Sequence, residues 1–198
     1  MAEPIDFYFD FASPYAYFLA EPLASLAAAH GRVLNWRPLM LWAVLKEIGL
    51  PPPLDNAVKR RYVLADMARS ARHVGKPFAL PDRFPVSSHL PARLFHELAA
   101  DDPAGAVRFA HRVFKAYFTE GADLGDAAVI EALALDCGIA RERARAGEAG
   151  RALVLRAIDQ AVAAGVWGSP YVVIGAEAFF GADRLPQIEA CLRGDLRP

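Results

Sequence analysis

An apolar strand that runs directly into a Ser-Pro pair and then a helix is the feature that most constrains this fold. Residues 5–11 read Ile-Asp-Phe-Tyr-Phe-Asp-Phe, a run typical of a buried strand. Ser13-Pro14 follows, and the apolar spacing after it predicts a helix over Tyr15–His30, with Pro14 at the favoured first position. The Ser13 hydroxyl would then lie where the unpaired N–H groups and the positive dipole end of that helix meet. We therefore expect an anion to bind beside Ser13.

A long helical block follows a second predicted strand. The strand is expected over Val33–Leu39, where Pro38 ends it, and helical spacing then dominates from Leu41 to Gly165. Glycine and proline segments such as 49–53 and 75–77 separate the predicted helices. These helices are Leu41–Ile48, Asp55–Val74, Ser88–Ala100, Ala104–Thr119, Asp126–Cys137 and Glu148–Ala164. The block is predicted to be an inserted helical subdomain.

The C-terminal segment supplies further strands. Short strands at Tyr171–Ile174 and Ala178–Phe180 flank a glycine-containing turn, a hairpin signal, and Asp183 is expected to cap a last helix that ends at Leu192. A β-α-β half, a helical insertion and a β-β-α half match the layout of the thioredoxin fold. We predict the α/β class and a thioredoxin-like fold with a large helical insertion. Residues 1–40 plus 165–198 would form the thioredoxin-like domain, and 41–164 the inserted helical subdomain.

Composition and charge argue against several classes of protein. The 198 residues are 55% hydrophobic and 23% charged, with a formal net charge of -1. These values are typical of a globular protein and argue against a general binder of nucleic acid or membrane surfaces. No window reaches the ~18 uncharged apolar residues of a membrane span. The acidic start lacks the cationic and apolar regions of a signal peptide, so a cytoplasmic location is expected.

Cysteine and histidine form no recognisable motif. Cys137 and Cys191 lie far apart in the sequence, and we expect two buried, inert thiols. The histidines show no metal-ligand spacing, so no metal site is predicted. They are His30, His73, His89, His96 and His111.

A second Ser-Pro pair, Ser169-Pro170, directly precedes the strand Tyr171–Ile174. The thioredoxin fold places a cis-proline there, and the residue before it offers its backbone to an extended thiol peptide, so we expect a cis bond and strand-like pairing. In thiol–disulfide oxidoreductases of this fold the first helix opens with Cys-x-x-Cys, whose thiolate the helix stabilises. Here those positions read Ser13-Pro14-Tyr15-Ala16. The thiol must then come from another molecule, and glutathione is the expected donor.

Three motifs together resemble one known family. They are Asp6-Phe7-Tyr8-Phe9-Asp10-Phe11-Ala12-Ser13-Pro14-Tyr15-Ala16-Tyr17, Gly165-Val166-Trp167-Gly168-Ser169-Pro170 and Phe179-Phe180-Gly181-Ala182-Asp183-Arg184-Leu185. The family unites the 2-hydroxychromene-2-carboxylate isomerases and the kappa-class glutathione transferases, which share a thioredoxin-like domain with a helical insertion. The motifs stand in the family's order at both ends of the chain, so the resemblance covers essentially its whole length.

The resemblance implies a role for each candidate site residue. Ser13 would be the catalytic residue and hold the glutathione sulfur, and Ser169 with Pro170 would pair with its cysteinyl part. Asp183-Arg184 would face the γ-glutamyl end, and Lys59 would approach the glycine carboxylate. Without the resemblance, Asp183 reads as a helix cap and Lys59 as part of a solvated helical face.

The chain also departs from the family pattern. Leu50 stands where relatives often carry an asparagine that binds glutathione, and Asn56 is a candidate replacement. Ser87 puts a smaller hydroxyl where an asparagine is common, and Phe180 replaces a frequent tryptophan. These changes bear on the second-substrate pocket more than on glutathione. Tyr15, Trp167 and Phe180 are candidates to pack against an aromatic ligand.

The resemblance implies a glutathione-dependent isomerase of 2-hydroxychromene-2-carboxylate or a related aromatic 2-oxo acid, acting by reversible thiolate addition and bond rotation. Its partners would be glutathione and a small aromatic substrate, and relatives are commonly homodimers. One alternative is a kappa-like glutathione transferase or peroxidase, in which sulfur stays attached to the electrophile. A further alternative is a non-catalytic thioredoxin-like protein that binds peptides.

Overall fold

The central sheet is assembled from both ends of the chain. In the computed structural model, which describes residues 3–145 and 148–196, its strand order is β2-β1-β3-β4. The strands are β1 (Ile5–Phe9), β2 (Leu34–Pro38), β3 (Tyr171–Ile174) and β4 (Glu177–Phe180). β1 and β2 are parallel, whereas β3 is antiparallel to both β1 and β4. The predicted β-α-β and β-β-α halves therefore share one sheet, and the thioredoxin-like fold is confirmed.

Helix α1 (Pro14–Ala29) begins and ends where its sequence signals predict. Ser13 is the N-cap, with extended backbone angles and a side chain that accepts a hydrogen bond from the Ala16 N–H. Pro14 occupies the first turn, where no intrahelical N–H bond is lost. The chain leaves the helix through Gly31, whose φ of 61° favours glycine. These signals place the start of α1 next to the carboxyl end of β1.

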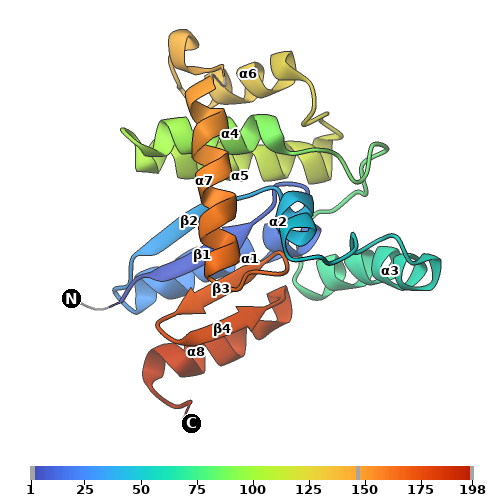
Figure 1. Ribbon diagram of the computed structural model, residues 1–198, viewed down its shortest axis with the longest axis vertical. Helices are drawn as coiled ribbons and strands as arrows, with labels where there is room; N and C mark the ends of the chain where they lie inside the picture. The colour runs from blue at the N-terminus through green and yellow to red at the C-terminus, as the bar shows by residue number, and fades with distance from the viewer. Residues whose placement is uncertain (1–2, 146–147, 197–198) are drawn as a thin grey trace.

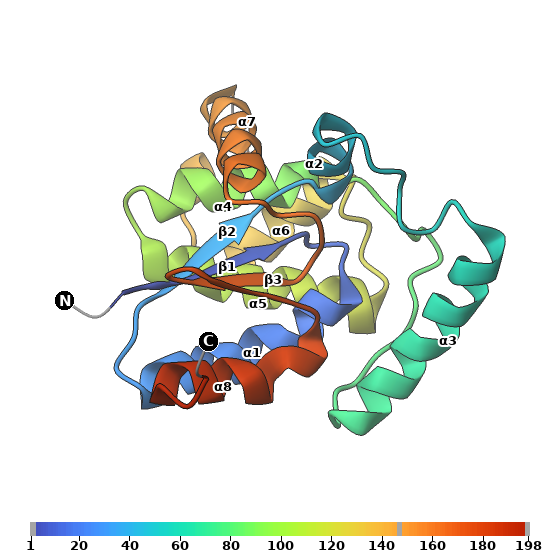
Figure 2. The same ribbon diagram turned by 60° about the horizontal axis from the view of Figure 1, so that its bottom comes forward.

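The helices predicted between the second and third strands are all present. They are α2 (Leu41–Glu47), α3 (Ala57–His73), α4 (His89–Ala99), α5 (Pro103–Glu120), α6 (Ala127–Asp136) and α7 (Glu148–Ala163), with a 3-10 turn at Arg141–Arg143. α7 crosses one face of the sheet, and α1 lies beside α8 (Leu185–Arg193) on the other (Figures 1 and 2). α3 projects to one side, away from α7 (Figure 2). No helix within the described residues is both long and apolar enough to span a bilayer.

An aromatic core joins the sheet to the helical block. Phe7 and Phe9 stack at 4.8 Å between ring centroids, and Phe9 lies 5.5 Å from Phe114 of α5. Phe11 also contacts Phe114, at 5.3 Å. All of these side chains are buried. The first strand and α5 therefore form one packed unit that fixes the position of the turn at Ser13.

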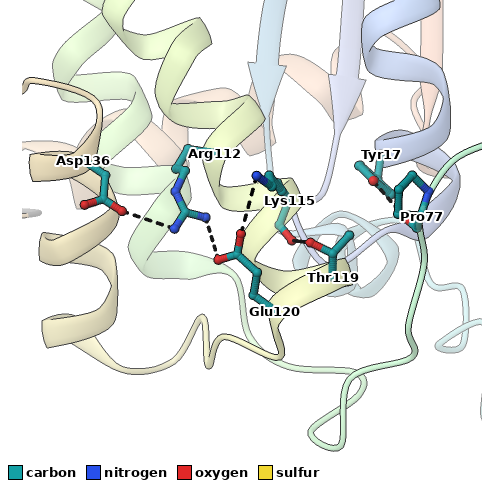
Figure 3. Close-up of polar contacts among 7 residues, drawn as sticks. All are labelled: Tyr17, Pro77, Arg112, Lys115, Thr119, Glu120 and Asp136. Carbon is teal, nitrogen blue, oxygen red and sulfur yellow. Dashed lines mark hydrogen bonds and ion pairs between the residues drawn. The ribbon is translucent and has the colours of Figure 1, made fainter.

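Polar contacts fasten the helices at the surface (Figure 3). Arg112 of α5 bonds Glu120 at 2.8 Å and Asp136 of α6 at 3.2 Å. The Tyr17 hydroxyl of α1 donates to the Pro77 carbonyl oxygen at 3.0 Å, which holds the segment that follows α3. Partly exposed ion pairs of this kind contribute about 0–1 kcal/mol each, so they guide packing more than they stabilise it.

Two details differ from the sequence-based expectations. Asp183 does not cap the last helix: it lies in a 3-10 turn, Ala182–Arg184, and α8 starts after it without a side-chain cap. Pro186 removes one of the two N–H groups that an Asp183 cap could bind, and the Asp183 carboxylate pairs instead with the Arg184 guanidinium at 3.1 Å. Cys137 and Cys191 are free but only partly buried, and burial raises the pKa of both thiols.

Candidate active site

The two Ser-Pro pairs meet in space. The Ser13 hydroxyl donates to the Ser169 carbonyl oxygen at 2.9 Å, although the residues are 156 positions apart. The Ala16 N–H donates to the same hydroxyl oxygen at 3.3 Å. The Ser169–Pro170 peptide bond is cis, as expected. The first turn of α1 and the backbone that leads into β3 therefore form one small site.

A buried carboxylate, Asp10, holds this site together. Its Oδ1 accepts from the Ala12 N–H at 2.8 Å and from the Ser88 hydroxyl at 2.6 Å. Its Oδ2 accepts from the Leu41 N–H at 2.8 Å, while the Asp10 N–H donates to the Ser169 Oγ at 2.9 Å. One residue thus fixes the turn before Ser13, the start of α2, the start of α4 and the cis-proline segment.

Burial raises the pKa of Asp10 above its usual value, against the hydrogen bonds from Ser88, Leu41 and Ala12, which lower it. The sequence analysis did not select Asp10. A carboxylate between the apolar residues Phe9 and Phe11 was the available signal, because such a group is buried only when several donors satisfy it. It also did not select Ser88, because the family pattern drew attention to the neighbouring Ser87. Ser87 instead lies 3.1 Å from the His89 ring nitrogen.

A backbone hydrogen bond connects the segment that carries Asp183 and Arg184 to the cis-proline. The Gly181 N–H donates to the Pro170 carbonyl oxygen at 3.2 Å, and the 3-10 turn that carries the pair packs against α1. Asp183 is exposed and pairs with the Arg184 guanidinium at 3.1 Å. This brings both charges to the same end of the sheet as Ser13.

Lys59 is farther from this group. It is exposed in the first turn of α3, and its N–H is capped by the Asn56 Oδ1 at 3.0 Å. The Asn56 oxygen therefore already accepts one hydrogen bond, and its amide N–H₂ is the group that could replace the family asparagine as a donor. Leu50 is exposed and its N–H donates to the Leu45 carbonyl oxygen at 2.8 Å, so that amide is used as well.

A tyrosine–aspartate bond links α3 to the site helix. The Tyr15 hydroxyl donates to Asp66 Oδ2 at 2.7 Å, and Arg69 pairs with the other oxygen of that carboxylate at 2.7 Å. Burial and then this bond raise the pKa of Tyr15, so its hydroxyl stays protonated. Lys59 lies seven residues before Asp66, about 10 Å along the helix axis. The placement of Lys59 relative to the Ser13 site thus depends on this link.

Two aromatic side chains flank the cis-proline segment. Trp167 and Phe180 lie 4.2 Å apart between ring centroids and remain 46% and 42% exposed. Gly168 makes this contact possible, because a Cβ there would lie 2.2 Å from the Phe180 ring atom Cε2. A half-exposed aromatic surface therefore stands two residues from Ser169.

The geometry suits a bound thiolate. Tyr15 carries an N–H in the first turn of α1, where no intrahelical acceptor exists, and the helix dipole adds positive potential. Ser13 adds a hydroxyl that can turn from the Ser169 carbonyl oxygen to a neighbouring anion. The four positions that open α1 contain no cysteine. The site has donors for a sulfur anion but carries no sulfur there itself.

Comparison with known proteins shows the family of this chain. The family described as the DSBA-like thioredoxin domain matches residues 4–193. The chain belongs to this family. It is 29% identical over 197 residues to a protein named 2-hydroxychromene-2-carboxylate isomerase from Sphingobium xenophagum, covering 97% of this chain and 99% of the relative. It is 30% identical over 194 residues to one of the same name from Pseudomonas putida, covering 95% and 93%. The resemblance seen in the sequence motifs is confirmed.

Two further comparisons extend the picture. Glutathione s-transferase kappa 2 from Caenorhabditis elegans is 23% identical over 200 residues, covering 93% of this chain and 89% of that protein. The solved structure of a 2-hydroxychromene-2-carboxylate isomerase superposes with a TM-score of 0.82 at 26% identity, covering 96% of this chain and 94% of the other. The proteins that this chain resembles thus include proteins named as isomerases and one named as a transferase.

Proposed function

We propose that this chain is a glutathione-dependent isomerase of 2-hydroxychromene-2-carboxylate or a related aromatic 2-oxo acid. The observation that carries the proposal is the Ser13 hydroxyl at the start of α1, 2.9 Å from the Ser169 carbonyl oxygen, in a chain that aligns end to end with proteins named for that reaction. Bound glutathione supplies a thiolate that adds to a conjugated double bond and leaves after rotation about the resulting single bond.

Ser13 and the first turn of α1 stabilise the thiolate form. A thiol with a pKa near 8.5 is about 3% ionised at pH 7, and lowering the pKa by ~1.5 units requires about 2 kcal/mol. A helix N-terminus contributes ~0.3–2 kcal/mol and a hydrogen bond to a charged group ~1.5–3 kcal/mol. Together they are sufficient to make the thiol roughly half ionised.

The remaining candidates orient the peptide and the substrate. Ser169 and Pro170 offer backbone atoms to the cysteinyl part, and Asp183 with Arg184 faces the γ-glutamyl end. Lys59 receives the glycine carboxylate. Trp167 and Phe180 present the aromatic surface against which a ring-containing substrate packs, beside the thiol.

The proposal extends to the oligomeric state, the location and the domain division of the enzyme. We infer a homodimer in the cytoplasm, with residues 1–40 plus 165–198 as the thioredoxin-like domain and 41–164 as the inserted helical subdomain. Light scattering after size-exclusion chromatography measures the oligomeric state directly. A mass near 21.5 kDa instead of twice that value would reject the dimer.

The test of the thiolate is a titration of bound glutathione by its ultraviolet thiolate absorbance. With excess wild-type protein the thiol pKa should fall below 8.5, and with Ser13→Ala it should return toward that value while turnover slows. Ser13→Thr keeps the hydroxyl and serves as the matched control. An unshifted thiol in the wild-type protein would overturn the proposal.

A second assay separates the candidate functions. The isomerase converts a chromene carboxylate without consuming glutathione. The kappa-like transferase is the second candidate, since a protein of that name aligns over 93% of this chain. It would instead consume glutathione with a chlorodinitrobenzene-type electrophile. Peptide binding without any glutathione binding in calorimetry would favour the non-catalytic alternative.

A further inference from the structure

A cavity of about 170 Å³ lies between the sheet and α7, apart from the Ser13 site. Tyr8 and Arg37 line it from the sheet, and Arg156 and Gln160 line it from α7. Tyr8 and Arg37 are partners across the parallel β1–β2 pair, so both face α7, the helix that crosses this face in Figure 1. None of the residues that line the cavity belongs to the group of Ser13, Ser169 and Asp10.

The side of α7 that borders the cavity carries two apolar and two polar residues. Leu153, Arg156, Ala157 and Gln160 recur at spacings of three, four and seven residues, which places them on one side of the helix. Ala157 is buried and Leu153 is partly buried, whereas Arg156 and Gln160 are exposed at the rim of the cavity. Within residues 3–145 and 148–196, no hydrogen bond or ion pair engages the Arg156 side chain.

The opposite wall adds a second guanidinium. Arg37 donates through Nε to Asp6 Oδ1 at 2.8 Å, and its guanidinium lies 5.7 Å from the centre of the Tyr8 ring. Asn35 donates to the same Asp6 oxygen at 2.8 Å. This pairing uses one of the five N–H donors of Arg37. Two cations therefore border the cavity. In the part of the chain that the structure describes, Asp6 is the one carboxylate that pairs with either of them, and it is not among the lining residues.

His96 does not add a charge. Its Nε2 lies 2.8 Å from the Pro38 carbonyl oxygen, which can only accept, so Nε2 carries a proton. Burial lowers the pKa of His96 and the nearby Arg37 lowers it further, against the bond to Pro38, so the ring is neutral at pH 7. The cavity is therefore lined by two cationic side chains, by Gln160 as a neutral donor and by the aromatic ring of Trp36.

We propose that this cavity binds a small organic oxyanion, a carboxylate or a phosphate, held between Arg37 and Arg156. Guanidinium groups present paired N–H donors that match both kinds of oxyanion. The volume is below the ~300–1,000 Å³ of pockets that hold drug-sized ligands, so the ligand is small. The Trp36 ring accommodates an apolar portion beside the charged end. This site is independent of the proposed isomerase function.

The test is an NMR titration of ¹⁵N-labelled full chain at constant ionic strength, with chloride replaced by inorganic phosphate in one arm and by sodium benzoate in the other. Saturable shifts in the amides of β2 and α7 are expected in at least one arm. Saturation only by benzoate would identify a carboxylate with an apolar part, and saturation only by phosphate would identify a phosphate. Saturation in neither arm would overturn the proposal.

Variants of Arg156 locate the binding. Arg156→Gln should weaken binding about tenfold or more, and Arg156→Glu should abolish it, because the new carboxylate supplies a partner for Arg37. Arg60→Glu makes the same charge change on α3, away from α7, and should leave the titration unchanged. Equal affinity in wild-type protein and Arg156→Gln would also overturn the proposal. Glutathione binding, measured separately, should be unaffected by the two Arg156 variants.

Discussion

Asp10 shows how one buried side chain sets the geometry of a site whose chemistry belongs to another residue. It is 8% exposed and accepts hydrogen bonds from Ala12, Leu41 and Ser88. Its own N–H reaches Ser169, the residue to which Ser13 donates. Asp10 is therefore a positioning residue for the candidate site, and its substitution should disturb both stability and catalysis.

Asp10→Asn should cost about 1–3 kcal/mol in the free energy of unfolding at pH 7. One of the N–H donors that face the carboxylate would then meet the amide N–H₂ and be left unsatisfied. The pKa of Asp10 is raised above the usual 3.8, so the folded state binds the proton more tightly than the unfolded state. Proton binding to Asp10 therefore stabilises the folded wild-type protein at low pH, and this stabilisation is lost as pH rises from 3.8 through the folded-state pKa.

The variant has no such group, so the stability gap between the two proteins should be larger below pH 4 than at pH 7. Urea unfolding of both proteins across this range measures the gap. A gap that widened instead as pH rose would show that the hydrogen bonds outweigh burial and that the carboxylate is held in its charged form. Ser88→Ala removes one donor and should raise the Asp10 pKa further.

Gly168→Ala should separate substrate binding from folding. The added Cβ would meet the Phe180 ring at 2.2 Å, but that ring is 42% exposed and can turn toward solvent. We expect a stability change below about 1 kcal/mol and a higher KM for the aromatic substrate, because Phe180 leaves Trp167. Steady-state kinetics and the near-ultraviolet circular dichroism of Trp167 measure the two effects. An unchanged KM with a displaced Phe180 would remove this pair from the substrate site.

At the scale of elements, α3 is attached to the rest of the molecule by a few identifiable contacts. The bond from Tyr15 to Asp66 holds its middle, and the Lys76–Glu21 pair at 2.8 Å holds the segment after it, together with the Tyr17 bond to Pro77. Only Met67 and Ala71 of the helix are buried. The stability of α3 thus rests on polar links more than on apolar burial.

Tyr15→Phe should loosen α3 without unfolding the core. The lost hydrogen bond has a carboxylate as its acceptor and is worth about 1.5–3 kcal/mol. Amide hydrogen exchange in residues 57–73 should therefore accelerate roughly tenfold or more. Tyr62→Phe is the matched control, since Tyr62 is exposed on the same helix. If Lys59 holds the glycine carboxylate, Tyr15→Phe should also weaken glutathione binding. Equal exchange in both variants would show that Tyr15 does not anchor the helix.

Local signals predicted nearly all elements but not how α3 docks. Ser13, Pro14 and Gly31 determine the ends of α1 through short-range capping chemistry, which a sequence states directly. The Tyr15–Asp66 hydrogen bond joins residues 51 positions apart and depends on tertiary packing, so no local sequence pattern predicts it. Asp183 illustrates a different case, because Pro186, which is visible in the sequence, removes one of the two N–H groups that a cap at Asp183 could bind.

At the scale of the whole molecule, the sheet explains why residues from opposite ends of the chain share one site. The antiparallel β1–β3 pair places Tyr8 beside Tyr171, which brings the carboxyl end of β1 to the start of β3. Ser13-Pro14 follows the end of β1 and Ser169-Pro170 precedes the start of β3, so the antiparallel pairing of these strands brings the two Ser-Pro pairs to one edge of the sheet. The cavity between Arg37 and Arg156 could not be predicted, since nothing local relates β2 to α7 across 119 residues.

Glutathione binding and pH should be coupled in the stability of the entire chain. If the site lowers the thiol pKa from 8.5, binding releases a proton between the two pKa values, and affinity rises with pH up to about 8.5. A ligand at a hundredfold excess over its Kd stabilises by about 2.7 kcal/mol, and each kcal/mol raises Tm by roughly 2–4 °C for a chain of this size. At one fixed glutathione concentration, the increase in Tm should therefore be larger at pH 8.5 than at pH 6.5. S-methylglutathione has no ionisable thiol and should give a shift that does not follow pH, and Ser13→Ala should reduce the pH dependence seen with glutathione. Identical pH dependence for glutathione and its S-methyl derivative would mean that the first turn of α1 holds the peptide without holding its sulfur as an anion.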